Sequence, residues 1–493
     1  MLQLEERMYK LMEEGVSYGK TKYSNYLEAA KDEYRESKGH SMDAMMESSI
    51  AKTLKATESE MRRVFGSKQV NQYFSEDATT PGDIDSFINY GFDMVTAMLP
   101  ASIIEDVASI QGTDSRIAEI FFMDIVKSKT KGSTQTAGDK YLAAQTGPNT
   151  GEHTSDEVVE LEELYDGDGS TVAFSTAILA WRPIKTISTV LKYTIGGVSY
   201  SITEASLTFT DATIASSSLS LTTGVLNVTF TTAPDNGTKV YVTYEQDSAR
   251  QDVNQNNEVI MKLSSLAVPT KRRFLNAKWM IDSAAMLVKE HGMDMEKELV
   301  EAMLAGVMNE ISIEVVNDQR DSATANDADN GNAAYDFDKT PPSTTIPYVV
   351  HRQELVGMVS TMSTGIEDKV RKVAGNFVVG GKDFVNIIKG LPRDMFEPIK
   401  YVDKTPVGIH TIGMLDNQYK VIQNFDYDNT DFMVGAKGNS WMNTGYVYAP
   451  YIPLMTTPIN WNQAGDHWRS LMTYYGKKVV NANFYAKGVI SAS

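Results

Sequence analysis

The sequence predicts an α+β protein that carries a small all-β insertion. A wide apolar stripe at helical spacing marks a long helix at 295–317, and a tract rich in Thr, Ser and Val at 170–248 alternates with period two. A mixed helical and extended section from 346 onward leads into aromatic strands at 441–493. A chain of 493 residues exceeds one ordinary compact core. We therefore expect several structural units.

Residues 1–94 are predicted to be a helical N-terminal arm. Apolar side chains such as Leu4 and Met8, and later Met42 and Ile50, recur at helical spacing between charge-rich stretches. Such elements usually bury their apolar side on another surface, so we expect the arm to dock elsewhere. A flexible charged tail is the alternative.

Residues 95–169 begin with apolar segments and continue into a polar loop at about 127–158. The composition of this loop, rich in Gly, Ser, Thr and Lys, suits an extended and exposed segment. Its lysines form the one local basic cluster of interest: Lys127, Lys129, Lys131 and Lys140. They are candidates for contacts with acidic surface on a neighbouring subunit, or they keep an exposed loop soluble.

The tract at 170–248 is predicted to be an inserted β-sandwich or barrel. Alternating runs at 226–230 and 240–244 flank the turn signal Ala-Pro-Asp-Asn-Gly-Thr at 233–238. Further short alternating runs precede them. We expect an Ig-like module placed inside a host domain.

The helix predicted at 295–317 carries an apolar stripe that includes Leu299, Met303, Val307 and Ile311. This stripe is most simply a face that packs on a core, and a cofactor-binding surface is the less favoured alternative. The sequence indicates no cofactor.

Composition and motifs exclude several function classes. The net charge of −18 disfavours a nucleic-acid binder that grips phosphates, and the absence of cysteine removes disulfides and thiolate chemistry. No apolar run approaches the roughly 18 residues that span a bilayer. The six histidines are scattered singly, without a zinc-binding spacing, and no nucleophile elbow is present. We therefore expect no enzyme and no metal site.

The segment GYVYAPYIPL at 445–454 is predicted to be a structural strand. Pro450 and Pro453 restrict ladder hydrogen bonds, so the strand should bend or end there. Tyr446, Tyr448 and Tyr451 offer apolar bodies with polar tips, which suits a core edge that meets a neighbour.

Three groups of residues resemble the major capsid proteins of T-even-type tailed phages. The C-terminal group has a Gly-x-Lys-Gly at 435–438, Ala-Pro-Tyr at 449–451 and Pro-Leu at 453–454. An upstream group has His-Gly-Met-Asp at 291–294 followed by Glu-Leu at 298–299, and a weaker match is MLPASIIEDVASIQ. The chain departs from the pattern at Tyr474, where the family has Arg, and it lacks a Pro near Asn483.

The resemblance implies the Hong Kong 97-type capsid fold, with a peripheral domain, a spine helix, an axial domain, an extended loop and an N-terminal arm. The implied organisation follows the chain in order: 1–94 arm, 95–169 start of the peripheral domain with the extended loop, 170–248 inserted β domain, 249–345 peripheral domain with the spine helix at 295–317, 346–440 axial domain, and 441–493 return to the peripheral domain.

The implied function is self-assembly into hexameric and pentameric capsomers that form an icosahedral or prolate phage head around double-stranded DNA. The implied partners are further copies of the chain and other capsid, portal or decoration proteins, and the implied location is the virion. Although T-even-type relatives are usually trimmed by a maturation protease, we expect 1–70 to be retained and to dock on neighbouring subunits. The alternative is another virion component, from the tail or a decoration, that carries an Ig-like module.

Overall fold

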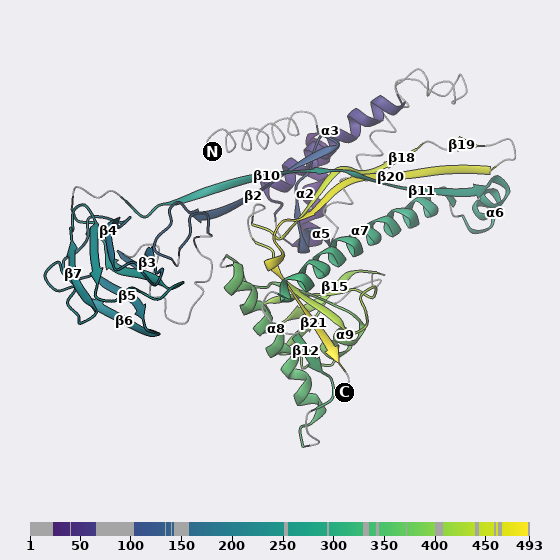
Figure 1. The fold of residues 1–493 in the computed structure, drawn as a ribbon. Helices are drawn as coiled ribbons and strands as arrows, with labels where there is room; N and C mark the ends of the chain where they lie inside the picture. Colours follow the sequence, from purple (N-terminus) through teal and green to yellow (C-terminus); the bar gives the residue numbers. More distant parts are fainter. Residues whose placement is uncertain are drawn as a thin grey trace. The chain divides into compact units, whose positions relative to one another are not determined.

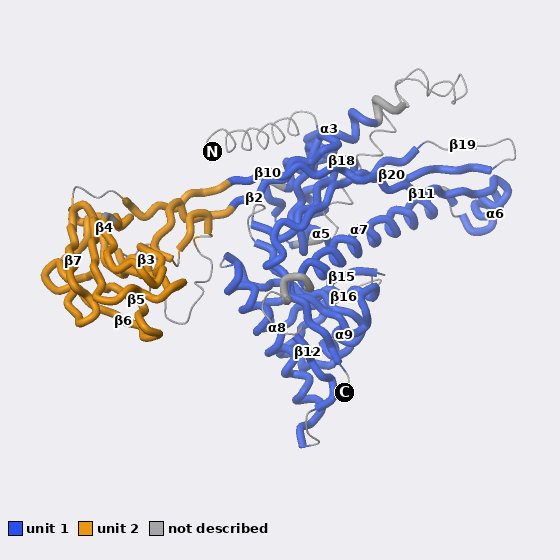
Figure 2. Tube along the Cα trace, viewed as in Figure 1, with its two compact units in different colours: residues 1–123, 263–493 blue, residues 124–262 orange. Residues whose placement is uncertain are grey.

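The computed structural model divides into two compact units (Figure 2), residues 1–123 with 263–493 and residues 124–262. The structure describes these residues: 23–39, 41–65, 103–133, 135–139, 141, 157–250, 255–292, 295–328, 335–341, 345–370, 372–399, 408–438, 443–457, 460–461 and 466–491.

The first unit contains a five-stranded sheet with the order β1-β18-β20-β11, and β19 pairs with β20 outside this path (Figure 1). Its strands are β1 (Ser109–Ile110), β11 (Lys271–Met280), β18 (Tyr446–Thr456), β19 (Asn460–Trp461) and β20 (Asp466–Val479). β20 pairs antiparallel with both β11 and β18, whereas β1 runs parallel to β18. Segments that lie more than 150 residues apart in sequence therefore form one sheet.

A seven-stranded sheet in the same unit has the order β12-β21-β17-β13-β16-β15-β14. Its strands are β12 (Tyr335–Asp338), β13 (Phe377–Gly380), β14 (Phe396–Pro398), β15 (His410–Leu415), β16 (Tyr419–Gln423), β17 (Asp431–Gly435) and β21 (Tyr485–Ser491). All residues of the central strands β13 and β17 are buried, which indicates that both faces of the sheet are covered.

Helices of the first unit are α5 (Ile104–Val107), α6 (Ile281–His291), α7 (Met295–Ala328), α8 (Tyr348–Val370) and α9 (Lys382–Lys389), with the 3₁₀ turn η2 (Ala482–Phe484). α6 ends at Gly292, whose φ of 66° suits glycine, and the Gly292 amide donates to the Val288 carbonyl. α7 extends well past the end predicted at 317. Its polar continuation stays helical because Gln319 and Ala323 are fully buried against the rest of the unit.

Two arm helices, α2 (Ser24–Lys38) and α3 (Ala44–Phe65), lie within the predicted arm. Their apolar side packs on another surface, as expected, and this surface belongs to the same chain, because Ile50 and Leu54 are fully buried in its core. The Ser49 hydroxyl donates to the Ile110 carbonyl at 3.2 Å, which anchors α3 beside the five-stranded sheet. The rest of the arm, 1–22 and 66–94, lies outside the described residues.

The second unit holds two small antiparallel sheets with the orders β3-β9-β5-β6 and β4-β8-β7. Its strands are β3 (Val158–Asp166), β4 (Ala173–Ile178), β5 (Val190–Ile195), β6 (Val198–Thr203), β7 (Ile214–Leu219), β8 (Val225–Phe230) and β9 (Lys239–Glu245). Both sheets contribute to one apolar core. A separate two-stranded ribbon is formed by β2 (Ile117–Lys127) and β10 (Val259–Pro269).

Strand β3 begins before the boundary predicted at 170. Its sequence, VVELEELYD, hides the alternation because four of its nine side chains are acidic and most of the strand is only partly buried. The register against β9 also shifts twice, between Val159 and Glu162 and between Glu163 and Tyr165. Such bulges break the period-two pattern by which strands are recognised in a sequence.

Phenylalanine rings lie directly over glycines in the seven-stranded sheet. A Cβ atom at Gly488 would collide with the Phe432 ring, and one at Gly435 would collide with the Phe377 ring. Phe432 and Phe377 are buried, so neither ring has room to retreat. These glycines are therefore required by close packing and not by backbone conformation.

We expect Gly488→Ala to lower the free energy of unfolding by about 1–3 kcal/mol, because the added methyl group overpacks a closed core. The matched control is Gly357→Ala in α8, where a Cβ meets no atom within 4 Å. That change should raise the free energy by about 0.5–1 kcal/mol through helix propensity. Denaturant unfolding of the two variants checks this, and equal effects would contradict the packing argument.

Candidate functional site

Among the described residues, no group of three or more His, Cys, Asp or Glu side chains could hold a metal ion. None of the helices in the described part of the chain is long and apolar enough to cross a membrane. The features that follow are buried networks that shape the first unit and surfaces that this unit presents.

A partly buried ionic network joins α7 to the five-stranded sheet. Glu314 on α7 accepts hydrogen bonds from the Tyr475 hydroxyl and the Lys477 ammonium of β20, both at 2.5 Å. The Arg273 guanidinium of β11 also pairs with Glu314, and its second nitrogen reaches Glu310 at 2.8 Å. One carboxylate thus contacts two strands of the sheet.

The neighbouring side chains determine the pKa of the Glu314 carboxyl. Burial alone raises the pKa of the carboxyl, but hydrogen bonds from Lys477, Tyr475 and Arg273 outweigh burial and lower the pKa to about 2. Burial, reinforced by the bond to Glu314, raises the pKa of Tyr475 above its ordinary value. The Glu314 carboxyl is therefore ionised across the whole neutral range.

The predicted structural strand is β18, and all of its residues are buried. Its register against β20 shifts between Pro450 and Ile452 and again between Ile452 and Met455, so the strand bends at the prolines but does not end. Pro453 itself lies within the second shift.

The tyrosines of β18 lie inside the chain. Tyr446 donates to Asp318 of α7 at 2.8 Å, and Tyr448 packs against Tyr475 with ring centroids 5.4 Å apart. Tyr451 meets Tyr474 edge to face at 6.3 Å. The sequence suggested that these tyrosines lie at a core edge that meets a neighbour. All three are instead buried within the chain, because the arm and α7 cover them.

The position where the family has Arg carries Tyr474, and its ring is approached by another arginine. The Arg116 guanidinium lies 5.8 Å from the ring centroid of Tyr474 and pairs with Glu60 of α3 at 2.9 Å.

The predicted lysine cluster is not assembled as one basic surface. Lys127 and Lys131 are buried, and the Lys131 ammonium lies 5.8 Å from the Trp181 ring. Lys129 pairs with Glu258 at 3.2 Å. Lys140 lies outside the described residues. Two of the three described lysines therefore serve packing within their own unit, contrary to the expectation of an exposed cluster.

The helix stripe is buried progressively along α7. Leu299 and Met303 are partly exposed, whereas Val307 and Ile311 are buried in the core. The stripe is a packing face, and its first turns retain apolar surface.

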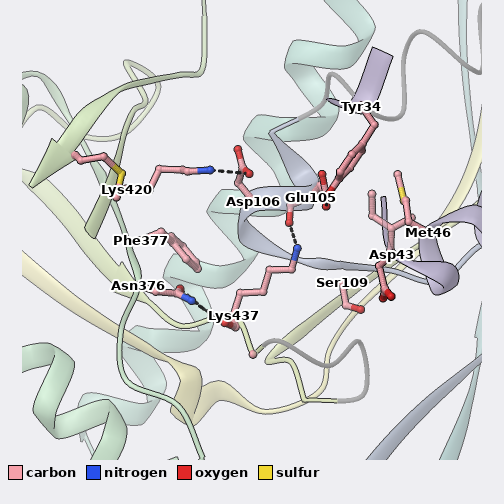
Figure 3. Close-up of a pocket in the computed structure, with 13 residues that line it drawn as sticks. Tyr34, Asp43, Met46, Glu105, Asp106, Ser109, Asn376, Phe377, Lys420 and Lys437 are labelled. Atoms are coloured by element: carbon pink, nitrogen blue, oxygen red, sulfur yellow. Dashed lines mark hydrogen bonds and ion pairs between the residues drawn. The ribbon is translucent and has the colours of Figure 1, made fainter. Parts of the chain in front are cut away.

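A polar cavity of about 400 Å³ lies where α2, α5 and the seven-stranded sheet meet (Figure 3). Lys437, the lysine of the Gly-x-Lys-Gly motif, donates to the Glu105 carbonyl, and Asn376 exchanges two hydrogen bonds with the Lys437 backbone. Lys420 pairs with Asp106 at 2.9 Å. The sequence motif pointed to Lys437 but not to its partner Glu105, which lies on α5 more than 300 residues away.

Several apolar side chains of α6 and the adjoining strand β11 are exposed, and we call this set the α6–β11 strip. None of the α6 residues is buried. Its exposed apolar members are Phe274, Leu275, Met280, Ile281, Met286 and Val288. Lysines at 271, 278 and 289 and Arg272 border them. A strip of this kind in an acidic chain suits docking against another protein surface.

We expect Glu314→Gln to lower the free energy of unfolding at pH 7 by about 1–3 kcal/mol, because two partly buried cations lose their charged partner. The folded pKa of about 2 lies below the ordinary 4.5, so the contribution of Glu314 is present above pH 4.5 and is lost as pH falls toward 2. The difference between variant and wild type should therefore shrink across this window. Glu310→Gln, at an exposed carboxylate, should change little at any pH. A pH-independent difference in denaturant unfolding would contradict the assignment.

Comparison with known proteins identifies related sequences. The profile of the family described as Major capsid protein Gp23 matches residues 84–493. The major capsid protein of Vibrio phage KVP40 is 23% identical over 251 residues, which cover 49% of this chain and 48% of that protein. The major capsid protein of Enterobacteria phage T4 is 25% identical over 254 residues, covering 48% and 47%. The chain spans about half the length of the curated relatives it matches.

Solved phage capsids also resemble the structure. The capsid of Myoviridae phage XM1 aligns with a TM-score of 0.32 and 9% identity, covering 49% of this chain and 80% of that one. A chain from Mycobacterium phage Bobi gives a TM-score of 0.32 and 9% identity over 50% and 80%. These scores are too low to establish a shared fold. The sequence profile, by contrast, covers well over half of the chain, and the protein therefore belongs to the Major capsid protein Gp23 family.

Proposed function

We propose that the chain is the shell-forming subunit of a phage head, a structural protein of the virion and not an enzyme. The observation that carries this proposal is the family match over residues 84–493. The exposed α6–β11 strip supports it, because a monomeric protein in water rarely exposes so many apolar side chains on one helix and its adjoining strand.

We further propose a Hong Kong 97-type organisation. In this assignment α7 is the spine helix, and the five-stranded sheet with α7 forms the peripheral domain. The seven-stranded sheet with α8 and α9 forms the axial domain, and the β2–β10 ribbon forms the stem of the extended loop. Element order and sheet membership support the assignment, since β18 and β20 return to the first sheet after the axial section.

The second unit is proposed to be an Ig-like insertion. Two antiparallel sheets that share one apolar core support this assignment. Of the described lysines near it, Lys129 is the one proposed to contact a neighbouring subunit, because its ammonium stays partly exposed while Lys127 and Lys131 are buried.

The proposed assembly consists of hexamers and pentamers that enclose double-stranded DNA, together with other head proteins. The net charge of −18 supports an enclosing role without tight binding, because an acidic surface repels phosphate. A tail or decoration component is the weaker alternative, since the family match extends far beyond the small β module.

The test compares particle formation by wild type, Met286→Glu and Met286→Leu. Met286 lies in α6 with 59% of its surface exposed, so neither change should disturb folding. We expect wild type and Met286→Leu to form closed shells or capsomers under electron microscopy. We expect Met286→Glu to reduce them by roughly tenfold or more, because a buried unpaired carboxylate costs several kcal/mol at an interface.

Circular dichroism of the three proteins controls for folding. Persistent wild-type monomers under assembly conditions would contradict the proposed function. Equal assembly by Met286→Glu and Met286→Leu would leave the function standing and remove the α6–β11 strip from the interface.

A further inference from the structure

The two outermost strands of the seven-stranded sheet differ in their charged surroundings: cations line a cavity beside β14, whereas carboxylates predominate at β12. β12 and β14 end the strand order, and each pairs with a single neighbour, β21 and β15. Neither has a second ladder partner within the described residues. With about 4.8 Å between neighbouring strands, the two edges are separated by roughly 29 Å.

The β14 edge borders a cavity of about 420 Å³ that is lined by cations and apolar groups. Lys389, Arg393 and His410 contribute the polar side chains, and the remaining lining residues are Leu391, Phe396, Pro398, Ile399 and Ile412. No carboxylate lines the cavity. Asp394 and Glu397 are exposed nearby, but they do not reach its wall. Lys389 donates to the side-chain amide oxygen of Gln423 at 3.3 Å.

The β12 edge is acidic. Asp336 is exposed, while Phe337 beside it points into the core with 4% exposure. The neighbouring carboxylates are Asp338, which accepts from the Thr340 amide, and Glu354 of α8, which is 56% exposed on its side chain. Lys339 at the end of the strand is already paired with Asp383 at 3.3 Å.

We propose that the basic cavity at the β14 edge receives the acidic β12 edge of a second copy of this chain, so that the sheets join head to tail around a capsomer. The inference rests on the proposed shell function and names the contact surfaces that serve it. Charge complementarity supports a second copy as the occupant, because each chain carries both the cation-lined cavity beside β14 and the acidic β12 edge. A head-to-tail contact uses two different surfaces and closes into a ring when the rotation between subunits permits.

The chain contains no cysteine, so introduced cysteines supply the only thiols that a crosslinker can react with. Asp336→Cys and Arg393→Cys are combined in one full-length chain and treated with a short bismaleimide during assembly. The two positions are too far apart to be bridged within one chain, so we expect a ladder of covalent dimers, trimers and higher rings. Each single variant should remain monomeric on a denaturing gel. The control pair Asp336→Cys with Glu33→Cys, the latter exposed on α2, should also give no ladder.

Exchanging the charges at positions 336 and 393 provides a second test of the contact. Asp336→Arg and Arg393→Glu should each reduce capsomer formation by roughly tenfold or more, and the combined variant should restore it, because the pair is attractive again.

Several results would overturn the inference while the shell function stands. Wild-type shells with no ladder from the double-cysteine chain would mean that the two edges do not meet. Dimers from Arg393→Cys alone would mean a two-fold contact instead. Failure of the charge exchange to restore assembly would exclude specific pairing. Absence of wild-type assembly would contradict the proposed function itself, and this inference with it.

Discussion

The placement of α7 across both sheets of the first unit is the constraint on which the rest of that unit depends. On one side Glu314 and Asp318 bind side chains of the five-stranded sheet. On the other side the Asn309 amide oxygen accepts from the Ile409 amide at 3.0 Å. The Tyr427 hydroxyl donates to the Val316 carbonyl at 3.1 Å. One helix therefore supplies the polar partners of both sheets.

These bonds fix the helix more strictly than apolar packing does. An apolar face tolerates sliding, whereas a buried tyrosine or carboxylate that loses its partner incurs the full cost of desolvation. Gln319 illustrates the point, since its amide donates to the Val107 carbonyl at 2.9 Å and to the Tyr485 hydroxyl at 3.3 Å. A shift of α7 by one turn would break all of these bonds together. The two sheets are thereby held in one arrangement that can present repeatable surfaces to other copies.

Features with a strong local pattern could be predicted from the sequence. The stripe of α7, the alternating runs of β8 and β9, and the proline-distorted strand β18 each follow from short-range periodicity and chemistry. The C-terminal end of α7 could not be predicted, because its polar residues stay helical only through buried long-range contacts of Gln319. Strand β3 was missed because acidic side chains masked its alternation.

The candidate site was less predictable than the fold. The sequence predicts Lys127 and Lys131 to be exposed loop cations, but it does not reveal that the Trp181 ring lies under the Lys131 ammonium. Glu314 is one of many carboxylates in an acidic chain, and nothing local distinguishes it from an exposed neighbour such as Glu310. Its role depends on Arg273 and Lys477, which come from strands distant in sequence and are adjacent only after folding.

The most direct test of the shell account is a side-chain-resolution cryo-EM reconstruction of particles assembled from the full chain. The account predicts closed particles in which a neighbouring copy covers the α6–β11 strip, while Glu314 stays paired with Arg273 and Lys477 inside each subunit. A chain that forms no closed particle would contradict the account, whereas particles in which that strip faces solvent in every subunit would exclude the strip from the interface and leave the shell function standing.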